Sequence, residues 1–375
     1  MPTHRAHPDP GLLLPAPLDA HPPLRDGPLL ALTVPHAARC FARAVVMPNL
    51  RPPVTDTAAA LAYRERILAH LPRGLAFEPL MTLYLTEATP PAEIRRAREA
   101  GIVGVKLYPA GATTASEAGV RELARVEPVL AAMAEEGLPL LVHAEVADPA
   151  VDVFDRERVF LEEQLAPLLE RHPRLRVVVE HLSTREGVAF VRQAREGVAA
   201  TLTAHHLLLN RNHLLAGGIR PHHYCLPVLK REEDRRALLA AAVSGEPRFF
   251  LGTDSAPHPR RLKEGACGCA GIYTSPQALA WYAQAFEAAG ALDRLEAFAC
   301  RHGPAFYGLE GGGQGAARRL VHLERREEPV PPAYEVAGEE IVPLGAGEVA
   351  AWRPAETSGA APDPEAGRPG PGGEP

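Results

Sequence analysis

Cysteine, aromatic residues and long apolar runs are all scarce in this chain of 375 residues. The five cysteines are an odd number spread along the whole length, which does not fit a disulfide framework, so we expect reduced thiols. No segment approaches the roughly 18 consecutive apolar residues of a membrane-spanning helix. The proline-rich start also lacks the continuous apolar core of a signal peptide. These absences predict a cytoplasmic protein with no membrane partner.

Charge of one sign is not concentrated anywhere in the chain. The formal net charge is −6, from 40 Lys and Arg against 46 Asp and Glu, and the basic residues are scattered. This distribution argues against nucleic acid as the main partner. No G-x-G-x-x-G motif follows an apolar run, which disfavours a dinucleotide-binding doubly wound sheet.

Apolar runs that read as buried strands alternate with amphipathic segments that read as helices. Seven runs are clear, and an eighth, weaker one around LLLPAPLDAH contains prolines that are poor strand formers. Eight such units are the count of a closed TIM (β/α)8 barrel of the metal-dependent hydrolase type. We assign the barrel to residues 12–354. Residues 1–11 and 355–375 are rich in Pro, Gly and small residues, and we expect both to be disordered.

Polar residues stand near the carboxyl ends of several of these runs. Any one of them, taken alone, is more often a satisfied polar group at a strand end than a functional residue. In a barrel, however, these ends converge on the face that carries active sites, and five at equivalent positions make coincidence improbable. The five are Asn49, Lys106, His143, His181 and Asp254.

Imidazole and carboxylate groups in such a set suit zinc, with His21 as a further donor. Lys106 is the odd member, because an ammonium group cannot bind a cation. If burial depresses its pKa, the free amine can react with carbon dioxide to form a carbamate whose oxygens bridge two metals. A hydroxide between those metals would be a nucleophile at neutral pH, and Asp254 could take and return a proton.

Several long segments resemble the stand-alone bacterial type of dihydroorotase, within the amidohydrolase superfamily, from about Asp19 to Trp352. The resemblance implies a zinc enzyme of pyrimidine biosynthesis that interconverts N-carbamoyl-L-aspartate and L-dihydroorotate, with a small-molecule substrate and a homodimeric state. The segments are DAHPPLRDG, VVMPNLRPPV, VKLYPAGATT, LLVHAEV, EHLSTRE, HHLLLNRNHLLAGGIRPHHYCLPVLK, LGTDSAPH, CGCAG and GPAFYGL.

The resemblance also implies a role for each matching residue. His21 and Asp254 are similar to the ligands of one metal, and His143 and His181 to those of a second. Lys106 is similar to the carboxylated lysine that bridges the two. The residues implied to contact the substrate are Arg25, Asn49 and His258 around its carboxylate, Leu226 and Ala270 through their backbone, His143, and Thr113 and Thr114 in a mobile loop.

One position departs from the family pattern. Pro23 stands where the family has a second histidine ligand, and proline has no donor atom for a metal. The first metal site is therefore expected to be short of one protein ligand and weakened.

Two histidine pairs and a cysteine pair are interpreted as structural residues and not as metal ligands. We interpret His205-His206 and His222-His223 as packing or loop residues rather than ligands, with His206 the nearest to the site. The Cys267-Gly-Cys269 pair has no partner pair at zinc-knuckle spacing and is interpreted as a loop.

Two alternative functions remain open from the sequence. A barrel that has lost catalysis could serve as a non-catalytic partner, for example of an aspartate carbamoyltransferase. Another cyclic amidohydrolase, such as a hydantoinase or allantoinase, is disfavoured by Arg25 and by the CGCAG loop.

Overall fold

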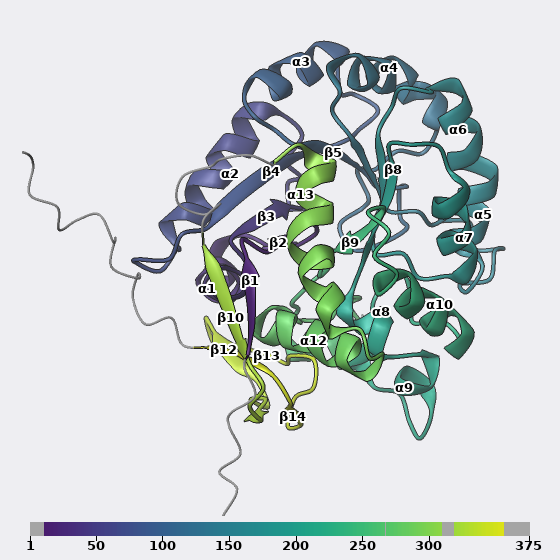
Figure 1. Ribbon diagram of the computed structural model, residues 1–375. Helices are drawn as coiled ribbons and strands as arrows, with labels where there is room; N and C mark the ends of the chain where they lie inside the picture. The colour runs from purple at the N-terminus through teal and green to yellow at the C-terminus, as the bar shows by residue number, and fades with distance from the viewer. Residues whose placement is uncertain (1–10, 267, 310–318, 356–375) are drawn as a thin grey trace, which may run out of the picture.

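Eight parallel strands form the centre of the molecule in the computed structural model, which describes residues 11–266, 268–309 and 319–355 (Figure 1). Each strand pairs with the next along the chain, so the sheet order is the sequence order. The strands are β2 (Leu18–Asp19), β3 (Arg43–Val46), β4 (Glu78–Tyr84), β5 (Gly104–Leu107), β6 (Leu140–Val142), β7 (Val177–Val179), β8 (Val198–Leu202) and β9 (Phe249–Leu251). The predicted barrel is confirmed.

The barrel closes where β2 meets β9. The Ala20 N–H donates to the Leu251 carbonyl at 3.1 Å, and the buried Asp19 carboxylate accepts from the Thr253 N–H at 2.9 Å and from the Thr253 hydroxyl at 2.6 Å. Burial raises the pKa of Asp19 to about 6. This seam holds the residue that follows β2, His21, next to the segment that follows β9.

The predicted first strand is divided in two, which corrects the expectation from the sequence. Only Leu18–Asp19 joins the barrel; β1 (Leu12–Pro15) pairs antiparallel with β10 (Leu320–Glu324) in a separate sheet completed by β15 (Arg353–Pro354). The break falls at Ala16, whose φ is 44°, between two prolines that cannot donate ladder hydrogen bonds. Short strand pairs β11 (Glu328–Pro329) with β14 (Val349–Ala350), and β12 (Tyr334–Val336) with β13 (Glu339–Ile341), lie beside it.

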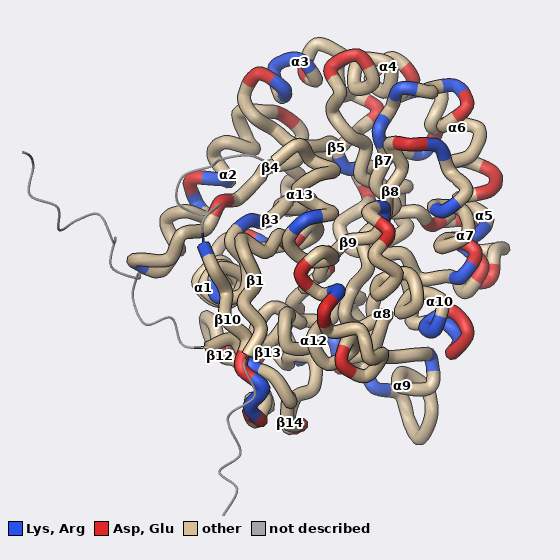
Figure 2. Tube along the Cα trace, in the orientation of Figure 1, with Lys and Arg blue, Asp and Glu red and all other residues tan. Residues whose placement is uncertain are grey.

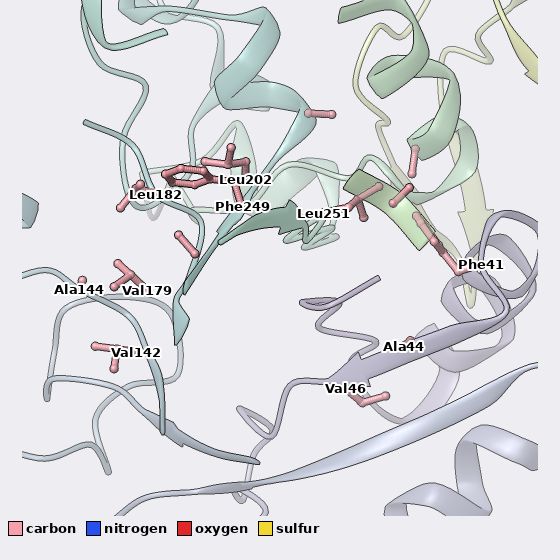
Figure 3. Packing of buried hydrophobic residues seen from close by; sticks show 14 of the residues in the cluster. Phe41, Ala44, Val46, Val142, Ala144, Val179, Leu182, Leu202, Phe249 and Leu251 are labelled. Carbon is pink, nitrogen blue, oxygen red and sulfur yellow. The ribbon is translucent and has the colours of Figure 1, made fainter. Parts of the chain in front are cut away.

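Alternate strand residues face opposite sides of the barrel wall, as the pleat requires. Outward residues such as Val142, Val179 and Leu251 pack in the main hydrophobic cluster (Figure 3). A second, smaller cluster contains Leu141 and Val178, the intervening residues of the same strands. Lys106 lies between Val105 and Leu107, which both belong to the outer cluster, so its side chain is on the barrel interior.

Helices cover the outside of the barrel (Figure 1). Asp56 caps α2 through its carboxylate, and Gly137 ends α4 with a φ of 67°. The helices are α1 (Leu30–Cys40), α2 (Thr57–Ala69), α3 (Pro91–Glu99), α4 (Glu127–Glu136), α5 (Arg156–Phe160), α6 (Ala166–Arg171), α7 (Arg185–Gln193), α8 (Ala204–Leu208), α9 (Arg211–Leu215), α10 (Glu232–Ala242), α11 (Arg260–Lys263), α12 (Ala278–Ala288) and α13 (His302–Tyr307).

Basic and acidic residues are interspersed along the outer helices (Figure 2). Among the described helices, none is long and apolar enough to cross a membrane. No disulfide joins the four described cysteines, Cys40, Cys225, Cys269 and Cys300. The extensions predicted to be disordered lie outside the described residues, apart from Gly11 and Ala355.

Candidate active site

The carboxyl ends of the barrel strands surround a small cavity, as expected for this fold. All fourteen residues on its wall belong to the segments singled out from the sequence. The wall consists of His21, Pro23, Arg25, Asn49, Tyr108, Thr113, Thr114, His143, His181, Leu226, Asp254, Ala256, Ala270 and Gly271.

Backbone strain is concentrated in this site. Six described residues other than glycine have a positive φ, and three of them are Arg25 at 66°, His181 at 43° and Asp254 at 43°. Non-glycine residues avoid this region because Cβ crowds the backbone, and they persist there where the surrounding structure holds them. The strain therefore lies at three residues to which the sequence assigned roles in metal or substrate binding.

Two histidines each lie against a buried glutamate. His21 Nδ1 lies 2.8 Å from Glu180 Oε1, and His143 Nε2 lies 3.0 Å from Glu145 Oε2. Although burial opposes charge on His21, the negative charge of Glu180 and the bonds to Asp254 and Glu180 raise its pKa overall. A carboxylate that holds one ring nitrogen leaves the other directed at a cation, which is the usual arrangement around metal-binding histidines.

Lys106 is completely buried within the barrel, and its Nζ donates to Glu180 Oε2. Burial lowers the pKa of Lys106, while the charge of Glu180 partly offsets that effect. The ammonium also lies 4.8 Å from the centre of the Tyr108 ring. Glu180 thus contacts both Lys106 and His21, and joins two of the predicted metal-binding residues.

The donor set is suited to hold divalent cations. His143 Nδ1 and His181 Nε2 face each other at 3.2 Å, and His181 Nδ1 is buried without a hydrogen-bond partner. Burial, together with nearby positive charges, lowers the pKa of His181 well below its ordinary value, so this imidazole is neutral and can donate a lone pair. The His21 ring centre lies 4.9 Å from that of His181, and His21 Nε2 lies 3.5 Å from Asp254 Oδ1.

Arg25 and Asn49 add a positive charge and an amide group to the cavity wall. Arg25 donates from Nη2 to His258 Nε2 at 3.0 Å, and Asn49 lies on the same wall. Burial, followed by the adjacent Arg25 charge, lowers the pKa of His258 to about 2, so His258 is a neutral acceptor here. Arg25 keeps further N–H groups with which to bind an anion.

The loop that carries Thr113 and Thr114 covers the cavity. Thr114 donates from Oγ1 to the Ala270 carbonyl at 3.3 Å, across from the other loop on the wall. With the loop in this position the cavity is only about 30 Å3 in volume, room for few water molecules.

Lys263 connects the two segments that contribute Leu226 and Ala270 to the wall. Its buried ammonium donates to the Tyr224 and Cys269 carbonyls, each at 3.0 Å, and to the Gly271 carbonyl. Three donors and three carbonyl acceptors satisfy the buried charge completely. The sequence analysis missed Lys263, because its three partners are backbone groups that leave no signal in the residue pattern.

A buried glutamate on α5 holds the segment that follows His181. The Glu157 carboxylate accepts from the Ser183 N–H at 2.8 Å, the Ser183 hydroxyl at 2.7 Å and the Thr184 N–H at 2.9 Å. We expect Glu157→Ala to lower the free energy of unfolding by about 3–5 kcal/mol, because it leaves buried donors unpaired. Urea unfolding would measure this, with Glu162→Ala on the exposed face of the same region as control, where a change below about 0.5 kcal/mol is expected. Equal losses in both variants would contradict the assignment.

The structure brings together all but one of the predicted site residues on the wall or inside the barrel, and His258 joins them through Arg25. Pro23 lies on the same wall as His21. Glu145 and Glu180 were not singled out, although each is an acidic residue at the end of an apolar run beside a predicted histidine. Their position beside a predicted histidine was the signal in the sequence that could have identified them.

The fold and this constellation define a barrel of the amidohydrolase class. The model of the amidohydrolase family matches residues 12–314. A dihydroorotase of Alkalilimnicola ehrlichii is 60% identical over 343 residues, which cover 91% of this chain and 98% of that protein. The crystal structure of dihydroorotase from Campylobacter jejuni has a TM-score of 0.85 at 35% identity, covering 93% of this chain and 98% of that one.

The structure of dihydroorotase from Saccharomyces cerevisiae in complex with 5-fluoroorotic acid also has a TM-score of 0.85, at 33% identity, with 92% of this chain and 99% of that chain covered. The chain therefore belongs to the dihydroorotase family of amidohydrolases, and it is an enzyme of this kind.

Proposed function

We propose that this enzyme interconverts N-carbamoyl-L-aspartate and L-dihydroorotate plus water, in pyrimidine biosynthesis. The observation that carries the proposal is the convergence of His21, Lys106, His143, His181 and Asp254 beside an arginine-lined wall. The 5-fluoroorotic acid in the yeast complex is a carboxylated pyrimidine, similar in size and charge to L-dihydroorotate.

Arg25 is the group proposed to bind the substrate carboxylate. Its planar guanidinium offers two parallel N–H groups, and Asn49 and His258 add orientation. Leu226 and Ala270 are proposed to contact the ring through their backbone, and Thr113 and Thr114 to close over it. The small volume of the closed cavity supports this role for the loop.

Arg25→Lys keeps the charge but removes the fork, so we expect KM for dihydroorotate to rise roughly tenfold or more, the equivalent of one lost charged hydrogen bond of about 1.5–3 kcal/mol. Steady-state kinetics in both directions would measure it. Arg51→Lys, at an exposed ion pair with Glu117, is the matched control and should leave KM unchanged. An unaltered KM in Arg25→Lys would remove this residue from the carboxylate site.

Two Zn2+ ions are the metals proposed for the site. His21 and Asp254 would hold the first, His143 and His181 the second, and Lys106, carboxylated by carbon dioxide, would bridge them. When bound, such cations act as Lewis acids and lower the pKa of water. The lowered pKa of Lys106 supports the modification, because only the neutral amine reacts with carbon dioxide. The carbamate keeps one N–H that can still donate to Glu180.

Asp254 is the residue proposed to move the proton. Its side chain is 14% exposed and lies on the cavity wall, and its backbone N–H is fixed by the His21 carbonyl at 2.9 Å. It can therefore accept a proton on one face of the substrate and return it to the amide nitrogen when the ring opens. Closure of the Thr113–Thr114 loop would exclude bulk water during this transfer.

Metal content per chain, measured with an assay in both directions, tests the proposal against the alternative of a non-catalytic barrel. Turnover of dihydroorotate with bound metal supports the enzyme; metal-free protein without turnover supports the alternative. A substrate panel that includes hydantoins and allantoin tests the alternative that the protein is another cyclic amidohydrolase. The family resemblance also underlies the proposal of a cytoplasmic homodimer. Sedimentation would test whether the protein is a dimer.

A further inference from the structure

A second group of metal-binding side chains lies outside the cavity, in the segments that follow β8 and precede Leu226. His205 and His206 on α8, together with Cys225, present donor atoms that all lie within 4.8 Å of one another. Within the described ranges no other three His, Cys, Asp or Glu residues meet this criterion. All three side chains are buried, at 0%, 2% and 1% exposure.

His205 has no hydrogen-bond partner at either ring nitrogen. Its side chain is completely buried, and no protein group satisfies these two polar atoms. An unpaired imidazole in such surroundings costs free energy, and a buried orphan of this kind calls for a specific explanation, such as a bound ion. Burial lowers the pKa of His205 well below its ordinary value, which keeps the ring neutral and its lone pair available.

Both ring nitrogens of His206 lie against oxygen atoms. The Pro227 carbonyl can only accept, so Nε2–H donates to it at 3.0 Å, and Nδ1 accepts from the Thr203 hydroxyl at 2.8 Å. A cation at Nε2 would take the place of this proton, and Nδ1 would then carry the proton and donate to Thr203. An oxygen that holds the second ring nitrogen is the usual support of a metal-bound histidine.

Cys225 adds a sulfur donor, whereas none of the donors proposed at the barrel mouth is a sulfur atom. Its Sγ lies 3.2 Å from the same Pro227 carbonyl, so that this oxygen adjoins two of the three donors and is a fourth candidate ligand. Burial raises the pKa of the Cys225 thiol well above its ordinary range, and the thiol is therefore protonated until a cation displaces the proton. Cation binding should accordingly release a proton.

We propose that His205, His206 and Cys225 bind a divalent, thiophilic cation, Zn2+ in the first instance, at a structural site separate from the barrel mouth. Two imidazoles and a thiolate are a donor set that selects zinc over magnesium or calcium. Bonds of about 2.0–2.3 Å place tetrahedral donors about 3.3–3.6 Å apart, so the side chains must move inward by about 1 Å at most. The bound cation would fix Cys225 and thereby the adjoining wall residue Leu226.

Cobalt substitution in the full-length protein tests this site without relying on activity. The protein is stripped with a chelator and titrated with Co2+, and thiolate ligation is followed by the near-ultraviolet sulfur-to-cobalt charge-transfer band. The donors proposed at the barrel mouth contain no sulfur, so the band reports only a thiol site. The variants are Cys225→Ser and His205→Gln, with Cys40→Ser and Cys269→Ser as cysteine controls.

The wild type and both cysteine controls are expected to show the band and to bind one more metal per chain than Cys225→Ser. His205→Gln should keep the band but need at least tenfold more Co2+ for half saturation. Near-ultraviolet circular dichroism of the metal-free variants checks that they fold. The proposal is overturned if the wild type has no band, if the band disappears in Cys269→Ser instead, or if Cys225→Ser binds as much metal as the wild type. These outcomes are independent of turnover, so they do not depend on the proposed reaction.

Discussion

Lys106→Ala is expected to lose at least about a thousandfold in kcat/KM, since bridged cations contribute several kcal/mol of charge stabilisation in the transition state. The Lys106 side chain is 0% exposed and lies beside Glu180 and Tyr108. Steady-state assays and metal analysis of the purified variant would measure the loss.

Chemical rescue separates the carbamate from a simple positive charge. Short carboxylic acids should restore part of the activity of Lys106→Ala, because they can occupy the space of the carbamate. Lys106→Arg keeps the charge but cannot form the modification, and it should stay as inactive as Lys106→Ala, without rescue. Wild-type activity in either variant would show that the carbamate is dispensable. Near-ultraviolet circular dichroism would check that Glu180, left without its partner, has not unfolded the barrel.

The residues that could be predicted are those whose chemistry and position coincide in one short segment. His143 and His181 each end an apolar strand, and the parallel barrel converts that repeated position into proximity. The strands from Arg43 onward were predicted for the same reason. The extent predicted for the first strand was wrong. Two closely spaced prolines divide this apolar run, and its two parts belong to different sheets.

The residues that could not be predicted act over long separations in the sequence. Glu157 bonds a segment 26 positions away, and Lys263 bonds carbonyl groups, which every residue possesses. Glu180 adjoins a predicted ligand, yet its contacts to His21 and Lys106 exist only because β2, β5 and β7 surround one interior. Such roles follow from the closed barrel and not from local spacing.

Pro23 lies on the cavity wall with His21, and this geometry defines what its replacement should do. In the proposed site the first cation would be held by His21, Asp254 and a carboxylated Lys106, whereas the second would have both His143 and His181. We therefore expect a mild chelator to remove one metal from the barrel mouth well before the other. Since each missing protein ligand weakens a zinc site substantially, the partly stripped enzyme should turn over more slowly.

Pro23→His should restore the missing imidazole, because the side chain at this position already faces the cavity. The expected result is a rise toward two chelator-resistant metals per chain at the barrel mouth, with kcat higher by about tenfold, the equivalent of roughly 1.4 kcal/mol of regained stabilisation. Pro23→Ala is the matched control: it removes the ring but adds no donor, so neither quantity should change. Titration with Zn2+ in competition with a chelator, performed in the Cys225→Ser background, would isolate the barrel site from the thiol site.

If Pro23→His gains neither metal nor rate, another group already completes the first site. Glu180 is the nearest candidate, since its Oε1 lies 2.8 Å from His21 Nδ1 and its side chain is buried. Glu180→Gln in the wild-type background would then lose the weaker metal, whereas the same change in Pro23→His would not.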